Sequence, residues 1–253
     1  MEGQIQAASG AKLRVLNRDI IKYIAMFTML LNHIAHIFLV KGTPLYEVLE
    51  DIGYFTAPAM CYFLAEGYVC TRSRFKYGFR LILFAVISQI PFQLAFGYQS
   101  LNMIYTLLCC FLILAVVENV ESPLLKMGLA MLLTLATVCG DWGVAAPIFT
   151  ILFYNGRGDR KQTIRAFAVC YVIFVILNVQ NYMNGEPGNW TAYAIFHAIL
   201  SGLGILAAGI AIVFFYNGKR MAFGKRFSQW FFYLFYPAHL LILYLIKTGM
   251  EHR

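Results

Sequence analysis

Long apolar stretches decide the class of fold that is open to this sequence. A helix that crosses a bilayer needs about 20 mainly apolar residues, and a helix satisfies its own backbone hydrogen bonds there. The sequence contains about nine such stretches, at residues 20–40, 52–70, 79–97, 101–119, 123–139, 143–155, 163–180, 190–215 and 229–247. The sixth is short, which favours a broken or tilted helix or one irregular unit with the fifth. We therefore predict an all-α, polytopic membrane helical bundle of about nine spans.

The composition excludes the main soluble classes of protein. Hydrophobic residues make up 60% of the chain and charged residues 13%, against about 45–50% and about 25% in ordinary soluble domains. So little charge cannot cover a soluble globule or keep a chain disordered. The six cysteines form no CxxC pair, so we expect small buried hydrophobic residues rather than a disulfide scaffold.

Basic residues gather in alternate loops between the apolar stretches. Of the 20 lysines and arginines, all but Lys41, Lys247 and Arg253 fall on the same side as the N-terminus. Cytoplasmic loops carry such an excess of positive charge. We therefore predict a cytoplasmic N-terminus and a C-terminus outside. The same pattern explains the net charge of +8 without a nucleic-acid partner.

The predicted domain organisation is simple. Residues 1–18 are expected to be a cytoplasmic N-terminal tail, and residues 19–253 a single transmembrane domain. The first apolar stretch is too long for the core of a signal peptide, so we expect it to be retained as a span. No long internal repeat points to a duplicated transporter fold.

Ionisable side chains within the apolar stretches are the main functional signals, because they are costly in a bilayer. Lys22 lies at the cytoplasmic end of the first stretch, and His33 follows about 16 Å deeper. Glu66 is expected between these depths, and His239 near the middle of the last stretch. This order places a cation, a carboxylate and imidazoles across the inner half of the membrane. A histidine there is a candidate general base.

Each of these residues also has a structural interpretation. Lys22 could be an anchor whose ammonium reaches the membrane surface. Glu66 could pair with Lys22 or an arginine, and a membrane histidine could join two helices by a hydrogen bond. His197 could be an interfacial residue. In the first stretch, by contrast, His36 lies one turn beyond His33, and this second histidine strengthens the functional interpretation.

Several motifs resemble the TraX family, and together they cover nearly the whole chain after residue 18. A lysine, ten intervening residues and a histidine, here Lys22 and His33, also resemble the more distant membrane acyltransferase-3 superfamily. The motifs that carry the resemblance are Asp19-Ile-Ile-Lys22, Asn32-His33, Ala57-Pro58, Ala65-Glu66-Gly67, Tyr77 to Arg80, Ser88-Gln89-Ile90-Pro91-Phe92, Leu101-Asn102 with Thr106, Gly140-Asp141-Trp142-Gly143 and Tyr236-Pro237-Ala238-His239-Leu240.

The resemblance implies an acyltransferase in a bacterial cytoplasmic (inner) membrane. TraX proteins are associated with N-terminal acetylation of pilin subunits, and the wider superfamily moves acyl groups from cytoplasmic acyl-CoA to acceptors on the other side. The implied co-substrate is acetyl-CoA, and no metal is expected. The acceptor could be a peptide amine, which is favoured, or a lipid or glycan hydroxyl. Membrane lipids surround the chain, and the oligomeric state stays open.

The resemblance and the predicted depths together suggest roles for individual residues. His33 would act as base or transient acyl carrier, and Asn32 or Thr106 could hold the developing oxyanion. Further catalytic candidates are Glu66 and His239. Anionic coenzyme A would lie against basic residues, with Lys22, Arg72, Arg74, Lys76, Arg80 and Tyr236 as candidates. The candidates for binding the acceptor are His36, Asn102, Thr106, Asp141 and His197.

Two other classes of function compete with this interpretation. Membrane histidines and carboxylates also serve proton relays, so the chain could be a proton-coupled transporter. Polar residues that only hold helices together would instead fit a membrane assembly subunit. Consumption of acyl-CoA separates the first hypothesis from both alternatives.

Overall fold

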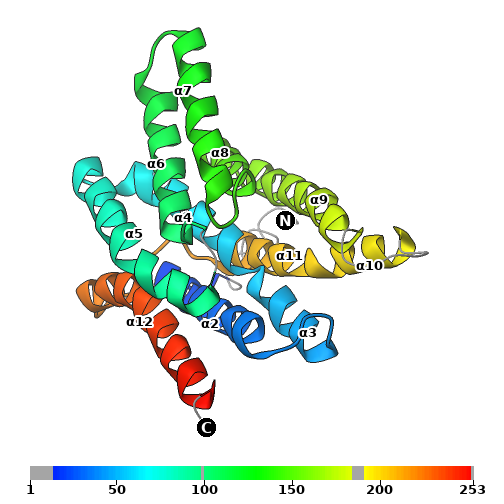
Figure 1. Cartoon of the computed structure of the whole chain (residues 1–253). Coiled ribbons are helices and arrows are strands. Elements are labelled where there is room, and N and C mark those ends of the chain that lie inside the picture. The colour runs from blue at the N-terminus through cyan, green and yellow to red at the C-terminus, as the bar shows by residue number, and fades with distance from the viewer. Residues whose placement is uncertain (1–13, 98–99, 184–190, 252–253) are drawn as a thin grey trace.

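A computed structural model describes residues 14–97, 100–183 and 191–251. The described residues form helices joined by short turns, which confirms the prediction of an all-α protein (Figure 1). The elements are α2 (Arg18–Phe38), α3 (Pro44–Gly53), α4 (Thr56–Cys70), α5 (Arg74–Phe96), α6 (Met103–Asn119), α7 (Pro123–Ala136), η1 (Thr137–Cys139), α8 (Ala145–Gly156), α9 (Arg160–Met183), α10 (Thr191–Ser201), α11 (Leu203–Ile210), η2 (Ala211–Phe215) and α12 (Lys225–Glu251).

Five of the described helical segments are long and apolar enough to cross a membrane. They are α2, α5, most of α9, the continuous unit of α10, α11 and η2, and α12. The shorter helices α4, α6, α7 with η1, and α8 lie in the other apolar stretches. Helix α3 falls between two of the predicted stretches and was not expected. These lengths and compositions are those of a helical membrane protein.

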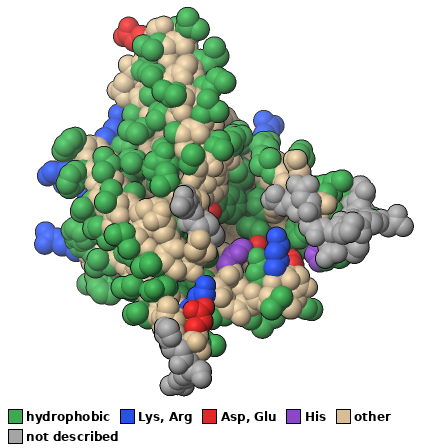
Figure 2. All heavy atoms as spheres, viewed as in Figure 1, with side chains coloured by type: hydrophobic (Ala, Val, Ile, Leu, Met, Phe, Trp, Pro, Cys, Tyr) green, Lys and Arg blue, Asp and Glu red, His purple; other side chains and the backbone are tan. Residues whose placement is uncertain are grey.

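Apolar side chains cover much of the outer surface, as expected for helices that face lipid. Figure 2 shows hydrophobic side chains over the α6–α7 hairpin and along both flanks. Helix α7 has no buried residue, and its Leu124, Met127, Met131 and Leu132 are each more than 60% exposed. In water such a helix would be unstable, whereas in a bilayer its apolar side chains meet lipid tails.

Helix α4 lies at the centre of the bundle. It contacts α2, α6, α8 and α11, and ten of its 15 residues are buried. The hydrophobic core runs through Cys61, Phe63 and Tyr68 on this helix. Cys61, Cys109, Cys110 and Cys170 are buried as expected, whereas Cys70 and Cys139 are exposed.

A short backbone bridge joins the start of α2 to the loop after η2. Leu16 N donates to the carbonyl of Phe215 (2.9 Å) and Arg18 N to that of Lys219 (2.9 Å). The side chain of Asp19, 1% exposed, accepts a hydrogen bond from Met221 N (2.7 Å). Residues 1–13 of the predicted tail lie outside the described residues, but the residues just before α2 are held firmly in place.

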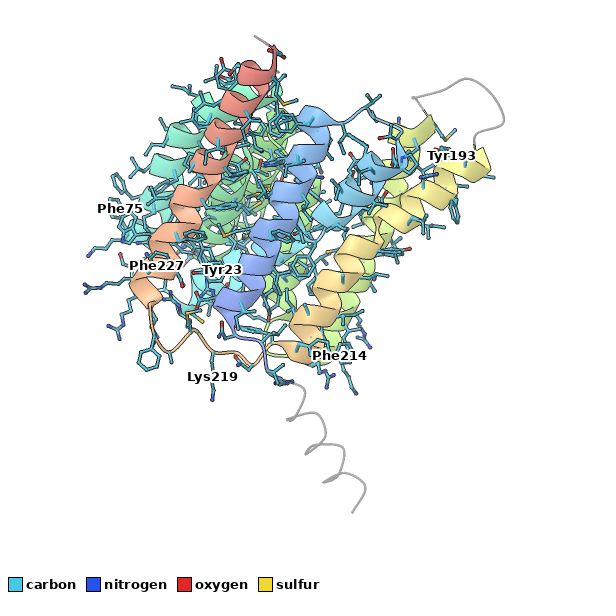
Figure 3. All side chains as sticks on the ribbon, turned by 90° about the horizontal axis from the view of Figure 1, so that it is seen from below. Tyr23, Phe75, Tyr193, Phe214, Lys219 and Phe227 are labelled. Atoms are coloured by element: carbon cyan, nitrogen blue, oxygen red, sulfur yellow. The ribbon has the colours of Figure 1, made fainter. Side chains whose placement is uncertain are left out.

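The two ends of the bundle differ in the residues that they carry. In Figure 3, Tyr23, Phe75, Phe227 and Lys219 lie toward one end, and Tyr193 lies at the other. We call the first the basic end, because it also carries the loops rich in lysine and arginine around Arg72 and Arg220. We call the second, with α3 and the turn after η1, the distal end.

The distal turn Gly140–Gly143 is fixed by contacts with α6. Asp141 N donates to the carbonyl of Leu101 (2.8 Å), and the hydroxyl of Thr106 donates to the carbonyl of Asp141 (2.7 Å). Gly140 leaves no room for a Cβ, which would collide with the Thr106 hydroxyl. Trp142 adopts a left-handed φ of 62°, a conformation that costs about 1–2 kcal/mol. Its ring stacks on Phe174, with centroids 5.6 Å apart, and this packing offsets the strain.

The free energy of unfolding should depend on pH through Asp141 in this turn. Burial raises the pKa of Asp141 from 3.8 to about 6, against a smaller opposing effect of the Trp142 backbone N–H. The buried charge therefore destabilises the folded state fully above about pH 6 and not at all below pH 3.8. Asp141→Asn should raise the free energy of unfolding at pH 8 by about 3 kcal/mol, since one pKa unit corresponds to about 1.4 kcal/mol. Thermal unfolding in detergent at pH 8 and pH 4 checks this, and equal effects at both values would contradict it.

Candidate functional site

Two buried histidines from opposite ends of the chain share a hydrogen bond. His33 Nδ1 on α2 lies 2.8 Å from His239 Nε2 on α12, and the side chains are 6% and 4% exposed. Their rings are nearly parallel, with centroids 5.0 Å apart. The sequence suggested a similar depth for both residues, and the structure brings them into direct contact.

The surrounding backbone determines which nitrogen atoms carry hydrogen. His239 Nδ1 lies 2.7 Å from the carbonyl oxygen of Phe235, which can only accept, so Nδ1 carries the proton. In the neutral ring, His239 Nε2 then accepts from His33 Nδ1–H. A neutral His33 is thus left with its lone pair on Nε2, which is the atom that a general base or nucleophile needs.

Aromatic rings surround the histidine pair. Phe96 meets the His33 ring edge to face at 5.0 Å. Tyr236 packs against both imidazoles, at 6.4 Å from His33 and 5.6 Å from His239. The hydroxyl of Tyr236 also accepts a hydrogen bond from Met103 N (3.3 Å), which joins α12 to the start of α6.

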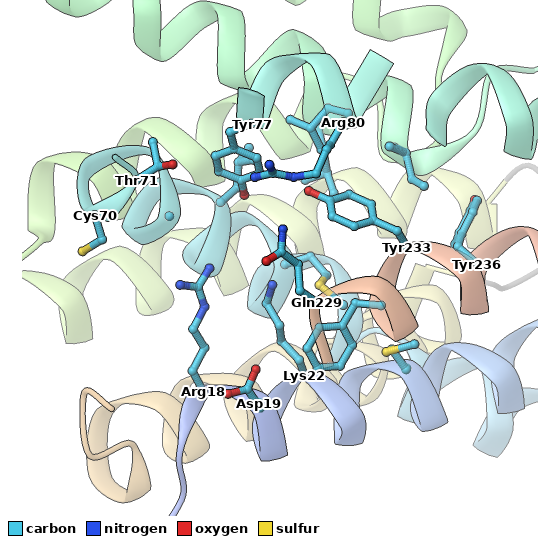
Figure 4. A pocket seen from close by; sticks show the side chains of 18 of the residues that line it. Arg18, Asp19, Lys22, Cys70, Thr71, Tyr77, Arg80, Gln229, Tyr233 and Tyr236 are labelled. Atoms are coloured by element: carbon cyan, nitrogen blue, oxygen red, sulfur yellow. The ribbon is translucent and has the colours of Figure 1, made fainter. Parts of the chain in front are cut away.

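A pocket of about 660 Å³ leads from the basic end toward this pair. Its size is within the range of small-molecule sites. In Figure 4, Arg18 and Lys22 from α2 face Tyr77 and Arg80 from α5, with Gln229 and Tyr233 from α12 between them. At its inner end the lining includes Met29 and Tyr236, each within about one helical turn of a histidine of the pair.

Positive charge dominates the polar lining of the pocket. Its outer part is lined by Arg18, Lys22, Arg72, Lys76, Arg80, Arg220 and Lys225, with Asp19 as the one carboxylate among the described lining residues. Asp19 already accepts from Met221 N. Such a lining favours a ligand with several negative charges.

Aromatic rings and a carboxylate hold the cations of α2 in place. Lys22 Nζ lies over the rings of Phe232 (5.2 Å) and Phe63 (5.9 Å). Arg18 Nε lies 3.7 Å from Glu66 Oε2, and the Tyr216 hydroxyl donates to Glu66 Oε1 (2.8 Å). The structure therefore makes Glu66 a partner of Arg18, which was one of its two expected roles.

Arg80 offers a donor that the described protein leaves unused. Its Nε is buried and has no hydrogen-bond partner among the described residues. The guanidinium lies over the rings of Tyr77 (5.6 Å) and Tyr233 (6.0 Å). An unsatisfied buried donor is costly, so an anionic ligand at this position would remove that cost.

A polar cluster lies on the distal side of His33. His36 Nε2 is 3.3 Å from Glu50 Oε1, and the Tyr46 hydroxyl lies 3.1 Å from His36 Nδ1 and 3.2 Å from Glu50 Oε1. Figure 2 shows histidine and acidic side chains together beside a hollow over α3. Asp141 is also near this cluster, since the charge of His36 acts to lower the pKa of Asp141.

Some expected site residues lie elsewhere. Arg74 pairs with Glu118 at 2.9 Å and does not line the pocket. The ring of His197 packs among those of Tyr182, Tyr193 and Phe196.

Three residues expected to hold the oxyanion or to bind the acceptor use their amide or hydroxyl groups within the protein. The amide of Asn32 donates to the carbonyl of Glu50 (3.3 Å). Asn102 is the N-cap of α6, where its Oδ1 accepts from two backbone N–H groups. The hydroxyl of Thr106 donates to the turn at Asp141. These bonds hold α3, α6 and the distal turn in place.

Other site residues were not singled out from the sequence. The pocket adds Arg18, Arg220, Lys225 and Gln229, and the distal cluster adds Tyr46 and Glu50. In the sequence, Arg18, Arg220 and Lys225 were counted only as signals of orientation. Their position beside apolar stretches could have suggested a binding role. The spacing of Tyr46 and Glu50, four residues apart, was the available signal for a shared helical face.

The sequence is similar to known proteins over most of its length. The family described as TraX protein matches residues 17–247. A protein of Dichelobacter nodosus named "Probable fimbrial assembly protein FimC, serogroup H1" is 34% identical over 250 residues, covering 91% of this chain and 96% of that protein. No solved structure matches. The family match and this relative confirm the resemblance seen in the motifs: the chain belongs to the TraX family.

Proposed function

We propose that this protein is an integral membrane acyltransferase that moves an acetyl group from cytoplasmic acetyl-CoA to an amine or hydroxyl acceptor on the outer side. The acceptor that we favour is the N-terminus of a pilin or another peptide. The observation that carries the proposal is the cationic pocket, which extends from the basic end to within about one helical turn of the buried His33–His239 pair.

The proposed topology places the basic end in the cytoplasm of a bacterial inner membrane. All nine apolar segments would cross the membrane, with the N-terminus inside and the C-terminus outside. The charge distribution supports this orientation, because two loops rich in lysine and arginine, around Arg72 and Arg220, line the pocket. A donor that exists in the cytoplasm would then reach the pocket without crossing the bilayer.

The pocket suits coenzyme A in size and charge. Phosphate groups would lie against the cations of the entrance, of which Arg80 also has its unused Nε–H. The apolar part, with Met26, Met29 and Leu107, would accept the pantetheine arm. The thioester would then approach His33.

The protonation of the histidine pair suits acyl transfer. In the proposed reaction, the acceptor atom attacks the thioester carbonyl carbon while His33 Nε2 takes a proton from it. The carbon–sulfur bond breaks, and the departing thiolate takes up that proton. His239 holds the lone pair of His33 on Nε2 by accepting from Nδ1–H, as the carboxylate does in a serine protease triad.

The relative from Dichelobacter nodosus supports a partner related to pili, because its name refers to fimbrial assembly. The same name would also suit an assembly subunit without catalytic activity. The two possibilities differ in one respect: an assembly subunit needs no acetyl-CoA.

Replacement of the proposed base tests the reaction. His33→Ala should lower acetyl transfer from radiolabelled acetyl-CoA about 100-fold or more, since general bases contribute about 10²–10⁴ in rate. Binding of acetyl-CoA to the purified variant should persist because His33 lies beyond the pocket lining.

The matched control is His197→Ala, because the structure places that ring away from the pair. It should transfer acetyl groups at the rate of the unchanged protein. Transfer by His33→Ala at that same rate would exclude His33 as the base.

Arginines on one helix provide a test of the pocket. Arg80→Ala should weaken acetyl-CoA binding about tenfold at low salt, because it removes charge-assisted hydrogen bonds. The effect should shrink as salt screens the remaining charges. Arg74→Ala, on the same helix but paired with Glu118, should bind within about twofold of the unchanged protein. Calorimetric titration measures both, and equal weakening by the two changes would contradict the assignment of the pocket.

A further inference from the structure

The distal cluster of His36, Tyr46 and Glu50 is held by three mutual polar contacts, of which two involve the Tyr46 hydroxyl and one is the His36–Glu50 ion pair. The three heavy-atom distances are 3.1 Å from Tyr46 Oη to His36 Nδ1, 3.3 Å from His36 Nε2 to Glu50 Oε1 and 3.2 Å from Tyr46 Oη to Glu50 Oε1. Tyr46 and Glu50 are 3% and 8% exposed. The side chain of His36 is 36% exposed, so this residue is the accessible member of the cluster.

This geometry accommodates an extra proton on His36. With His36 neutral and its hydrogen on Nε2, that hydrogen lies on the side of Glu50, and Nδ1 accepts from the Tyr46 hydroxyl. If the hydroxyl turns to Glu50 Oε1, Nδ1 is free to accept a proton and then donates to Tyr46 Oη. Both states satisfy the two ring nitrogens, and the second places an imidazolium beside a carboxylate.

The cluster lies beside the proposed base, on its distal side. His36 follows His33 by three residues on α2, so the two rings are close to one face of that helix. Phe96 packs against both, at 5.0 Å from His33 and 6.3 Å from His36. The titratable groups near His36 are His33 on its own helix, Tyr46 and Glu50 on α3, and Asp141 in the distal turn.

Acetylation of an amine requires the loss of two protons from nitrogen. An amine reaches the enzyme near neutral pH as RNH₃⁺ and leaves as an amide with one N–H. The reaction is RNH₃⁺ plus thioester, giving amide, thiol and H⁺. The proton that leaves during attack goes through His33 to the thiolate. The other must leave before attack, because an ammonium has no lone pair.

We propose that the His36–Tyr46–Glu50 cluster is the site that binds the incoming ammonium and removes its first proton. The proposal rests on the proposed acyltransferase function. It assigns the first deprotonation to His36 and the removal of the second proton, during attack, to His33. The carboxylate of Glu50 attracts the cation, and His36 Nδ1 accepts the proton as the Tyr46 hydroxyl turns. His36 then releases that proton to the distal side, while the neutral amine attacks the thioester beside His33.

The test compares two acceptors that differ in whether they arrive protonated. One is a short peptide amide with an N-terminal glycine, whose α-amino pKa is about 8. The other is the same peptide with an N-terminal aminooxyacetyl group, which is neutral at pH 6.5. The quantity measured is the ratio of kcat/KM for the amine to kcat/KM for the aminooxy peptide. Both values come from one preparation, so a loss of folded protein cancels in the ratio.

Two conservative changes should alter that ratio in a pH-dependent way. Tyr46→Phe and Glu50→Gln should each lower it at least tenfold at pH 6.5, because only the amine needs the first deprotonation. At pH 9 the amine arrives neutral, so the ratio should return to that of the unchanged protein. Glu47→Gln is the matched control on α3, since its carboxylate accepts from Tyr182 instead, and it should leave the ratio as it is.

Two results would overturn the proposal. If Tyr46→Phe and Glu50→Gln slow both acceptors equally at both pH values, the cluster has only a structural role, and the acyltransferase itself stands. If the unchanged protein binds no acetyl-CoA and acetylates neither peptide, the proposed function fails and this inference fails with it.

Discussion

A hydrogen bond between two buried imidazoles is the contact on which the arrangement of the site depends. It joins α2 to α12, which are about 200 residues apart in the chain. The same two helices supply much of the pocket lining, which includes Tyr236, three residues before His239. Because the Phe235 carbonyl fixes the proton of His239, the packing of α12 also determines which nitrogen of His33 carries the lone pair. The position of one helix therefore controls both the pocket and the base.

The two sides of this histidine pair have opposite charge. Lysines and arginines line the pocket at the basic end, whereas Glu50 and Asp141 lie near His36 at the distal end. An anionic donor and a cationic acceptor would thus be attracted from opposite sides of the membrane. The two histidines between them are buried, at 6% and 4% exposed, and a site closed to water would favour transfer to the acceptor over hydrolysis.

The sequence was most informative where a single physical rule applies. The length of the apolar stretches predicted the helices, and the depth of His33 and His239 suggested a common level. The sequence did not predict which distant helices contact each other, because the periodicity of apolar residues does not specify the partner of a helical face. Arg74 and Arg80 look alike in the sequence, but one pairs with Glu118 and the other lines the pocket. Helix α3 was missed because its mixture of polar and apolar residues lacks the length of a span, and Tyr46 and Glu50 were missed with it.

The most direct test of the account is a cryo-electron microscopy structure of the protein with a non-hydrolysable acetyl-CoA analogue in lipid nanodiscs. We expect phosphate density against Arg80 and Lys76, and the acetyl carbonyl carbon near enough to His33 Nε2 for one acceptor atom to fit between them. Density for the analogue at another site, or an acetyl group far from His33 in a fully occupied pocket, would contradict the central claim.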